Sequence, residues 1–94
     1  MITIELKVNS SLIALAGNPF GKKIFNDQVK PQLTEEKDYC IVFPNHIQKI
    51  ASSFIEGFFS YWKNSIGIDG IAQHIQIIAV YPGLRESIIK NLFD

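Results

Sequence analysis

The sequence predicts an α/β domain with a mixed sheet of about four strands and three helices, in the order β-β-α-β-α-β-α. Residues 2–8 alternate apolar and polar side chains, with the period of a half-buried strand. Residues 39–43 form a continuous apolar run, which is typical of a strand covered on both faces. Helical patterns separate the later strands, so we expect a mainly parallel sheet with an antiparallel hairpin at its edge.

The hairpin prediction depends on the apolar run at residues 12–16, which follows a turn signal and is broken by Gly17. We expect this run to pair back on residues 2–8. Asn18 and Pro19 then predict a helix start, because Asn caps well and Pro loses no intrahelical hydrogen bond in the first turn. Pro31 disfavours helical geometry in the residue before it, so this helix should end or kink there.

The most distinctive segment is an aromatic-rich helix expected over about residues 53–65 and ended by Gly67. A strand is expected at 74–81, and Pro82 and Gly83 should open a final helix. The aromatic helix carries an apolar stripe wide enough to cover a sheet, made of Phe54, Ile55, Phe58, Phe59, Trp62 and Ile66.

Two adjacent hydroxyls precede this helix. Ser52 and Ser53 stand where N-caps belong, and Glu56 completes a possible capping box with Ser53. Beside the apolar stripe lies a row of small or polar residues that permits close backbone approach, either to the sheet or to another protein: Ser53, Gly57, Ser60 and Asn64.

Composition narrows the class of protein. Ninety-four residues fit one domain, residues 1–94, and 47% hydrophobic against 19% charged residues argues against disorder. Nine basic and nine acidic residues cancel, which removes the positive field that binding to nucleic acid or to an anionic membrane needs. No apolar run approaches the roughly 20 residues of a membrane span. The single cysteine, Cys40, excludes an internal disulfide and favours the cytoplasm.

No catalytic or metal-binding pattern stands out. Cys40 lies in a predicted buried strand without a basic neighbour, and His46 and His74 lack metal-ligand spacing. The segment from Asn18 to Lys23 has two ammonium groups at a helix start but lacks the glycine-rich pattern of a phosphate-binding loop. Neither serine has a nucleophile elbow or a recognisable base partner. We therefore expect no enzyme, no cofactor and no metal.

The segment 42–59 resembles the signature of STAS-like domains of unknown function. These are bacterial relatives of the sulphate-transporter and anti-sigma-factor-antagonist fold. The resemblance is carried by the step Ile47-x-x-Ile50, by the turn Ser52-Ser53-Phe54 and by the Glu56-Gly57 pair that follows. Phe43 stands where such domains often have an acidic residue.

The resemblance implies a non-enzymatic regulatory module that docks a protein partner through the loop and helix start at residues 46–58. A histidine-kinase-type ATPase is the partner class that it implies, with Ser52 or Ser53 as the phosphoacceptor. Two alternatives stay open: a homo-oligomeric domain whose aromatic surface buries itself, and a small hydrolase or nucleotide-binding protein. The implied contact residues are His46, Gln48, Lys49, Ser53, Glu56, Gly57 and Ser60.

Overall fold

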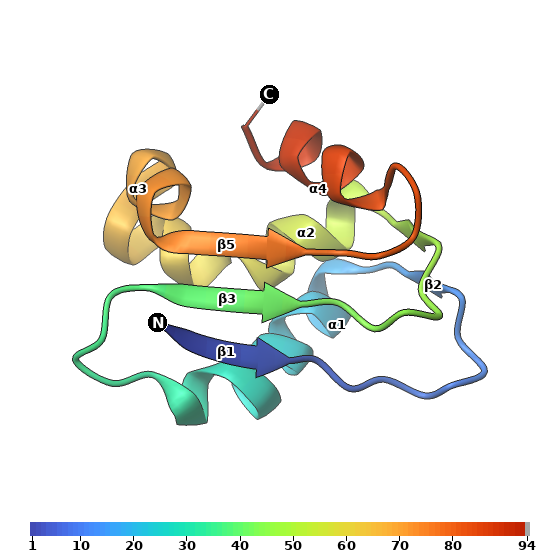
Figure 1. Ribbon diagram of the computed structural model, residues 1–94, viewed down its shortest axis with the longest axis horizontal. Helices are drawn as coiled ribbons and strands as arrows, with labels where there is room; N and C mark the ends of the chain where they lie inside the picture. Colours follow the sequence, from blue (N-terminus) through green and yellow to red (C-terminus); the bar gives the residue numbers. More distant parts are fainter. Residues whose placement is uncertain (94) are drawn as a thin grey trace.

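Parallel strands organise the fold. A computed structural model describes residues 1–93, in which β1 (Ile2–Glu5), β3 (Tyr39–Val42) and β5 (Ile75–Ile78) form a sheet in the order β1-β3-β5 (Figure 1). A second, two-stranded sheet joins β2 (Ala14–Leu15) to β4 (Lys49–Ile50), and every strand pair is parallel. The α/β class and the central position of β3 are therefore confirmed.

The N-terminal hairpin prediction is wrong. β1 pairs with β3 and β2 pairs with β4, so residues 12–16 never return to residues 2–8 and the expected mixed sheet is absent from residues 1–93. An alternating pattern fixes which face of a strand is buried, but it leaves the choice of a partner strand open. The partner of each N-terminal strand lies 35 to 37 residues further along the chain.

Residues 1–93 contain four α-helices, one more than expected. The first continues into a π turn and a 3₁₀ turn that contains Pro31, close to the predicted end. The expected helix at 53–65 is two helices, because the backbone leaves helical geometry at Phe59. The helical elements are α1 (Asn18–Ile24), η1 (Phe25–Val29), η2 (Lys30–Gln32), α2 (Ser52–Phe58), α3 (Ser60–His74) and α4 (Leu84–Phe93).

Gly67 kinks α3. Its φ of 72° and ψ of 174° lie in a region that glycine alone adopts readily, so the predicted helix end at Gly67 is a real break. The chain then resumes helical geometry as far as His74, the residue at which the strand was expected to begin. β5 is accordingly shorter than predicted.

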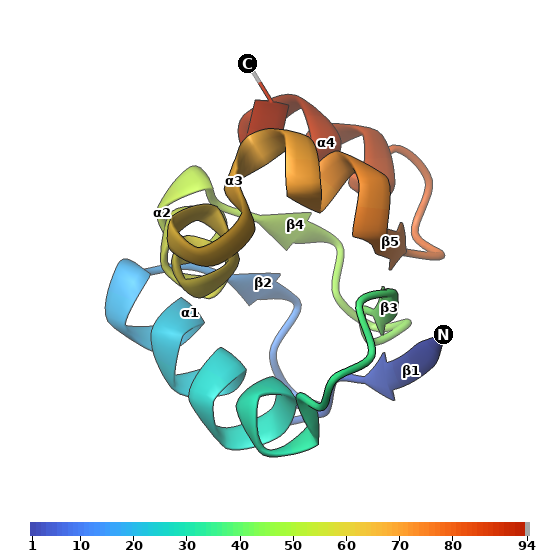
Figure 2. The ribbon, with the colours of Figure 1, turned by 90° about the vertical axis from the view of Figure 1, so that its left-hand side faces the viewer.

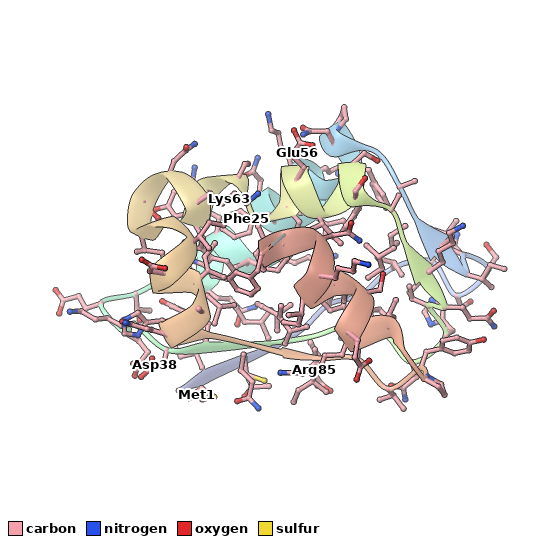
Figure 3. All side chains as sticks on the ribbon, turned by 90° about the horizontal axis from the view of Figure 1, so that it is seen from above. Met1, Phe25, Asp38, Glu56, Lys63 and Arg85 are labelled. Carbon is pink, nitrogen blue, oxygen red and sulfur yellow. The ribbon has the colours of Figure 1, made fainter. Side chains whose placement is uncertain are left out.

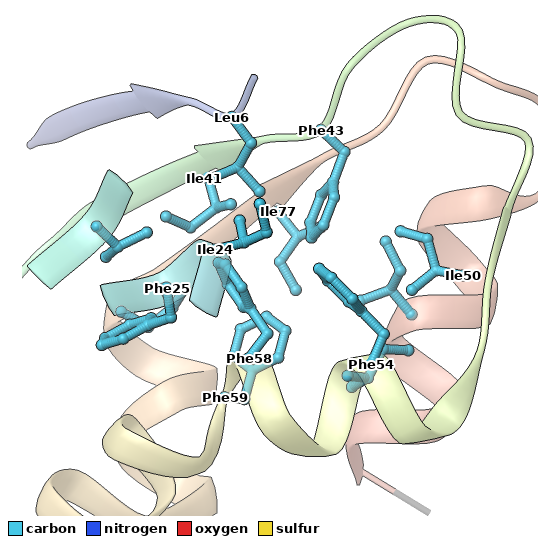
Figure 4. Packing of buried hydrophobic residues seen from close by; sticks show 14 of the residues in the cluster. Leu6, Ile24, Phe25, Ile41, Phe43, Ile50, Phe54, Phe58, Phe59 and Ile77 are labelled. Carbon is cyan, nitrogen blue, oxygen red and sulfur yellow. The ribbon is translucent and has the colours of Figure 1, made fainter. Parts of the chain in front are cut away.

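The helices cover one face of the three-stranded sheet, and the core lies between the two layers (Figures 2 and 3). Phe58 is its centre and lies within 6 Å, ring centroid to centroid, of Phe25, Phe43, Phe54 and Phe59 (Figure 4). The predicted apolar stripe is thus buried. Its last member, Ile66, is 41% exposed because it lies at the kink.

The opposite face of the sheet is open in residues 1–93. Thr3 and Glu5 of β1 and Gln76 and Ile78 of β5 are exposed there. Parallel sheets are usually covered on both faces, so this single-sided arrangement is unusual. Cys40 is nonetheless buried at the centre of that face, and its burial raises the pKa of the thiol.

Backbone contact between α1 and α2 explains the small-residue row. A Cβ built on Gly57 would lie 2.1 Å from the carbonyl oxygen of Asn18, and one on Gly21 would lie 2.3 Å from that of Phe54. The two helices touch through these glycines. Close approach therefore occurs within the chain, and Gly57 is buried.

Candidate docking surface

The loops that follow the three parallel strands gather at one end of the molecule, because parallel strands share a carboxyl edge (Figure 1). His46 lies in the loop after β3, and its Nε2 is 3.1 Å from the carbonyl oxygen of Asn9 in the loop after β1. This contact ties the first two loops together. Part of the predicted docking segment thus lies at the sheet edge where α/β proteins commonly place binding sites.

An exposed apolar pair lies directly beside the predicted contact residues. The N–H groups of Gln48 and Lys49 both donate to the carbonyl oxygen of Ile13, at 2.7 and 3.3 Å. Ile13 is 58% exposed and Leu12 is 37% exposed, while Gln48 and Lys49 are exposed just before and at the start of β4. We call Leu12, Ile13, Gln48, Lys49 and Ser52, which follows Lys49 by three residues, the docking patch.

Sequence reasoning missed Leu12 and Ile13 as surface residues. It placed them in a strand with the rest of the run 12–16, yet only Ala14 and Leu15 are in β2 and only Leu15 is buried. The polar turn just before the run was a signal that its first residues belong to a loop. It did not indicate that they would stay uncovered.

Neither serine caps α2. The N-cap is Ala51, whose carbonyl oxygen accepts the N–H groups of Phe54 and Ile55, and the first turn has no side-chain cap. Ser53 Oγ instead accepts the N–H of Gly17, 36 residues earlier, at 3.0 Å. The capping-box prediction is therefore wrong, because α2 begins at Ser52 and Ser53 lies inside its first turn.

This bond distinguishes the two serines. Ser53 is partly buried and joins the start of α2 to Gly17, the N-cap residue of α1. Ser52 is exposed in the first turn of α2. Of the two predicted phosphoacceptors, Ser52 is the one that a modifying enzyme can reach without breaking a tertiary hydrogen bond.

The remaining predicted contact residues do not form one surface. Gly57 is buried against Asn18, and Ser60 is partly buried and donates its hydroxyl to the Gly57 carbonyl oxygen at 2.9 Å. Glu56 is exposed on the helix side of the molecule, away from the sheet (Figure 3). Gly57 and Ser60 therefore support the α1–α2 and α2–α3 junctions, and Gln48 and Lys49 remain as accessible contacts.

Two side chains bond to backbone groups at or beside the outer strands of the three-stranded sheet. The side-chain amide of Gln28 accepts a hydrogen bond from the N–H of Lys7 and donates one to the Lys7 carbonyl oxygen, both at 2.7 Å. Lys7 lies just after β1. On the other side, Arg85 Nε donates to the carbonyl oxygen of Ile77 in β5 at 2.9 Å. These bonds use backbone groups that an added strand would need.

Residues 1–93 contain neither a cluster of metal-binding side chains nor a helix suited to cross a membrane. Across residues 1–93, no three side chains among His, Cys, Asp and Glu come together as a metal site. None of the helices in that range combines the length and apolar character that a bilayer crossing requires. His74 Nδ1 is 2.8 Å from an Asp38 carboxylate oxygen, at the opposite end of the sheet from the docking patch.

Comparison with protein-family models, with curated proteins and with solved structures found no match. Inferences about function therefore start from the docking patch and its chemistry.

Proposed function

We propose that this chain is a non-enzymatic regulatory module of the cytoplasm that binds another protein through the docking patch. The observation that carries the proposal is the exposed pair Leu12 and Ile13, with Ile13 held beside the polar residues Gln48 and Lys49 by two hydrogen bonds. Apolar side chains rimmed by polar ones are typical of protein contact sites. Val80 and Tyr81, 64% and 40% exposed in the loop after β5, add apolar surface at the same end.

Charge at Ser52 provides the switch in this proposal. A phosphate there adds close to two negative charges at the border of the patch. Leu12 and Ile13 are the apolar part of the patch, so a partner that contacts them together with Ser52 would have to desolvate that charge on binding. Phosphorylation of Ser52 is therefore expected to release the partner. The STAS-like resemblance gives a histidine-kinase-type ATPase as the partner class.

Site-specific photo-crosslinking in living cells tests the docking patch. A photoreactive phenylalanine analogue at Ile13 should give one discrete crosslinked product. The same analogue at Lys90, an exposed residue of α4, should give none. Ser52→Asp should remove the Ile13 product, whereas Ser52→Ala should keep it. Equal products from both positions, or none from Ile13, would contradict the proposal.

The homo-oligomer is a second candidate, because the same apolar pair suits a second copy of the chain. Most of the aromatic stripe is already buried within one chain, so a self-interface would use Leu12 and Ile13 instead. Light scattering on the intact protein and on Ile13→Asp separates the two functions. A dimer mass that falls to a monomer mass in Ile13→Asp supports self-association, whereas a monomer in both samples rules self-association out.

A further inference from the structure

A pocket of about 440 Å³ opens at the amino ends of the strands, opposite the docking patch. Its walls come from the connector between η2 and β3, from the start of β3 and from both arms of the kinked helix α3. Trp62 and Ser65 lie before the Gly67 kink, and Gly70 and His74 lie after it. The kink thus gives α3 a concave side, and the volume falls within the range of small-molecule sites.

Buried aromatic side chains form the apolar part of the wall. Tyr39 and Trp62 are 3% and 4% exposed and pack against each other, with ring centroids 5.9 Å apart. Tyr61 adds a third ring, 43% exposed, and Leu33 and Ile66 contribute aliphatic surface. Flat walls of this kind favour a planar ligand.

The Trp62 indole N–H indicates which polar group such a ligand would carry. In residues 1–93 it donates to no protein acceptor, although every fully buried side-chain nitrogen or oxygen there has a partner. The Nε1 atom of this 96%-buried residue must therefore reach accessible surface, and the pocket is the open space that Trp62 lines. An indole N–H can only donate.

The other polar groups of the pocket also favour an acceptor on the ligand. Tyr39 Oη accepts the N–H of Thr34 at 2.9 Å, which leaves its hydroxyl hydrogen to donate. Lys37 adds a cation at the rim. The Glu36 carboxylate is already engaged by the N–H groups of Lys37 and Asp38, at 3.0 and 3.3 Å. Its negative charge is partly satisfied by those donors.

We infer that this pocket binds a small planar carboxylate, with its ring against the wall that Tyr39, Tyr61 and Trp62 form and its carboxylate facing the indole N–H and Lys37. His74 lines the same pocket, while its Nδ1 is paired with Asp38, so Nε2 is the ring atom left for a ligand. This inference goes beyond the proposed protein-interaction function and rests on different residues.

Two-dimensional ¹H–¹⁵N NMR tests it, because Trp62 is the only tryptophan and gives a single indole signal. Sodium 2-naphthoate is the probe, and neutral 2-naphthamide has the same rings without the charge. We expect a saturable downfield shift of the indole signal with 2-naphthoate. The affinity for 2-naphthamide should be roughly fivefold lower, the effect of one solvated charge pair.

Variants separate the pocket from other sites. Lys37→Gln should lower the affinity for 2-naphthoate by roughly fivefold and leave the affinity for 2-naphthamide unchanged. The matched control Lys90→Gln on α4 should change neither affinity. Ser65→Phe should fill the pocket and abolish both shifts, with the other amide signals confirming the fold. No indole shift up to the solubility limit, or an undiminished shift in Ser65→Phe, would overturn the site. Equal affinity for the two probes would overturn the carboxylate assignment.

Discussion

The glycine contact between α1 and α2 makes a sharp prediction for Gly57→Ala. The new Cβ would start 2.1 Å from the Asn18 carbonyl oxygen and 2.9 Å from the Asn18 carbonyl carbon. Ordinary carbon–oxygen contacts lie near 3.3 Å, so the two helices must separate by about 1.2 Å. No side chain can rotate away to relieve the clash, because every atom concerned belongs to the backbone.

The expected loss of unfolding free energy follows from two opposing effects. Overpacking costs about 1–3 kcal/mol or more, and a backbone clash belongs at the upper end of that range. Alanine regains about 1 kcal/mol because it favours the helix over glycine. We therefore expect Gly57→Ala to destabilise the protein by about 2 kcal/mol, a large share of the roughly 5–15 kcal/mol of a small domain.

Urea denaturation measures this loss, with Glu56→Ala as the matched control on the exposed side of the same helix. The control should stay within about 0.5 kcal/mol of the parent protein. Gly21→Ala alone should lower the unfolding free energy. The further loss in the Gly57→Ala background should be smaller, because Gly57→Ala has already separated the helices. A Gly57→Ala protein as stable as the control would refute the close backbone contact.

Three further predictions concern single positions. Ser53→Ala should lower the unfolding free energy by about 1 kcal/mol because it orphans the Gly17 N–H, while Ser52→Ala should leave it unchanged; thermal denaturation compares them. Gly67→Ala should cost about 1–3 kcal/mol from backbone strain alone, since its Cβ would contact nothing within 4 Å, and a smaller loss in urea denaturation would contradict the kink. The backbone N–H groups of Asp38 and Lys37 lower the pKa of Glu36 below 4.5, so its ionised form stabilises the fold above pH 4.5 and less as pH falls through the lowered pKa. The stability difference between the parent and Glu36→Gln should therefore shrink below pH 4.5 in acid titrations.

Periodicity predicted the elements whose burial repeats locally. The run 39–43 gave the central strand, and the aromatic rows of residues 54–62 gave the core face of α2 and the start of α3. These patterns depend on the spacing of apolar residues along one face of a helix or strand, which can be read directly from the sequence. The fold class follows from them.

The sequence could not identify partners that are distant along the chain. Residues 2–8 show the same alternation in an antiparallel hairpin as in a parallel pair, so the pairing with β3 was not encoded locally. Ser53 likewise has the chemistry of a cap, and only the folded chain brings Gly17 within its reach. Ile13 was missed as a contact residue because its exposure depends on which other segments of the folded chain pack near it, and the local sequence does not specify them.

The constant separation of partners has a consequence for how the chain folds. β1 with β3, β2 with β4, and Gly17 with Ser53 all join residues 35 to 37 positions apart. None of these contacts can form as a local hairpin. Once one of them closes its loop, the others need almost no additional loss of chain entropy, since the same two segments are already aligned. We therefore expect a slow first association followed by the cooperative appearance of the β1–β3, β2–β4 and α1–α2 pairs in a single kinetic phase, with β5 joining through a loop of its own.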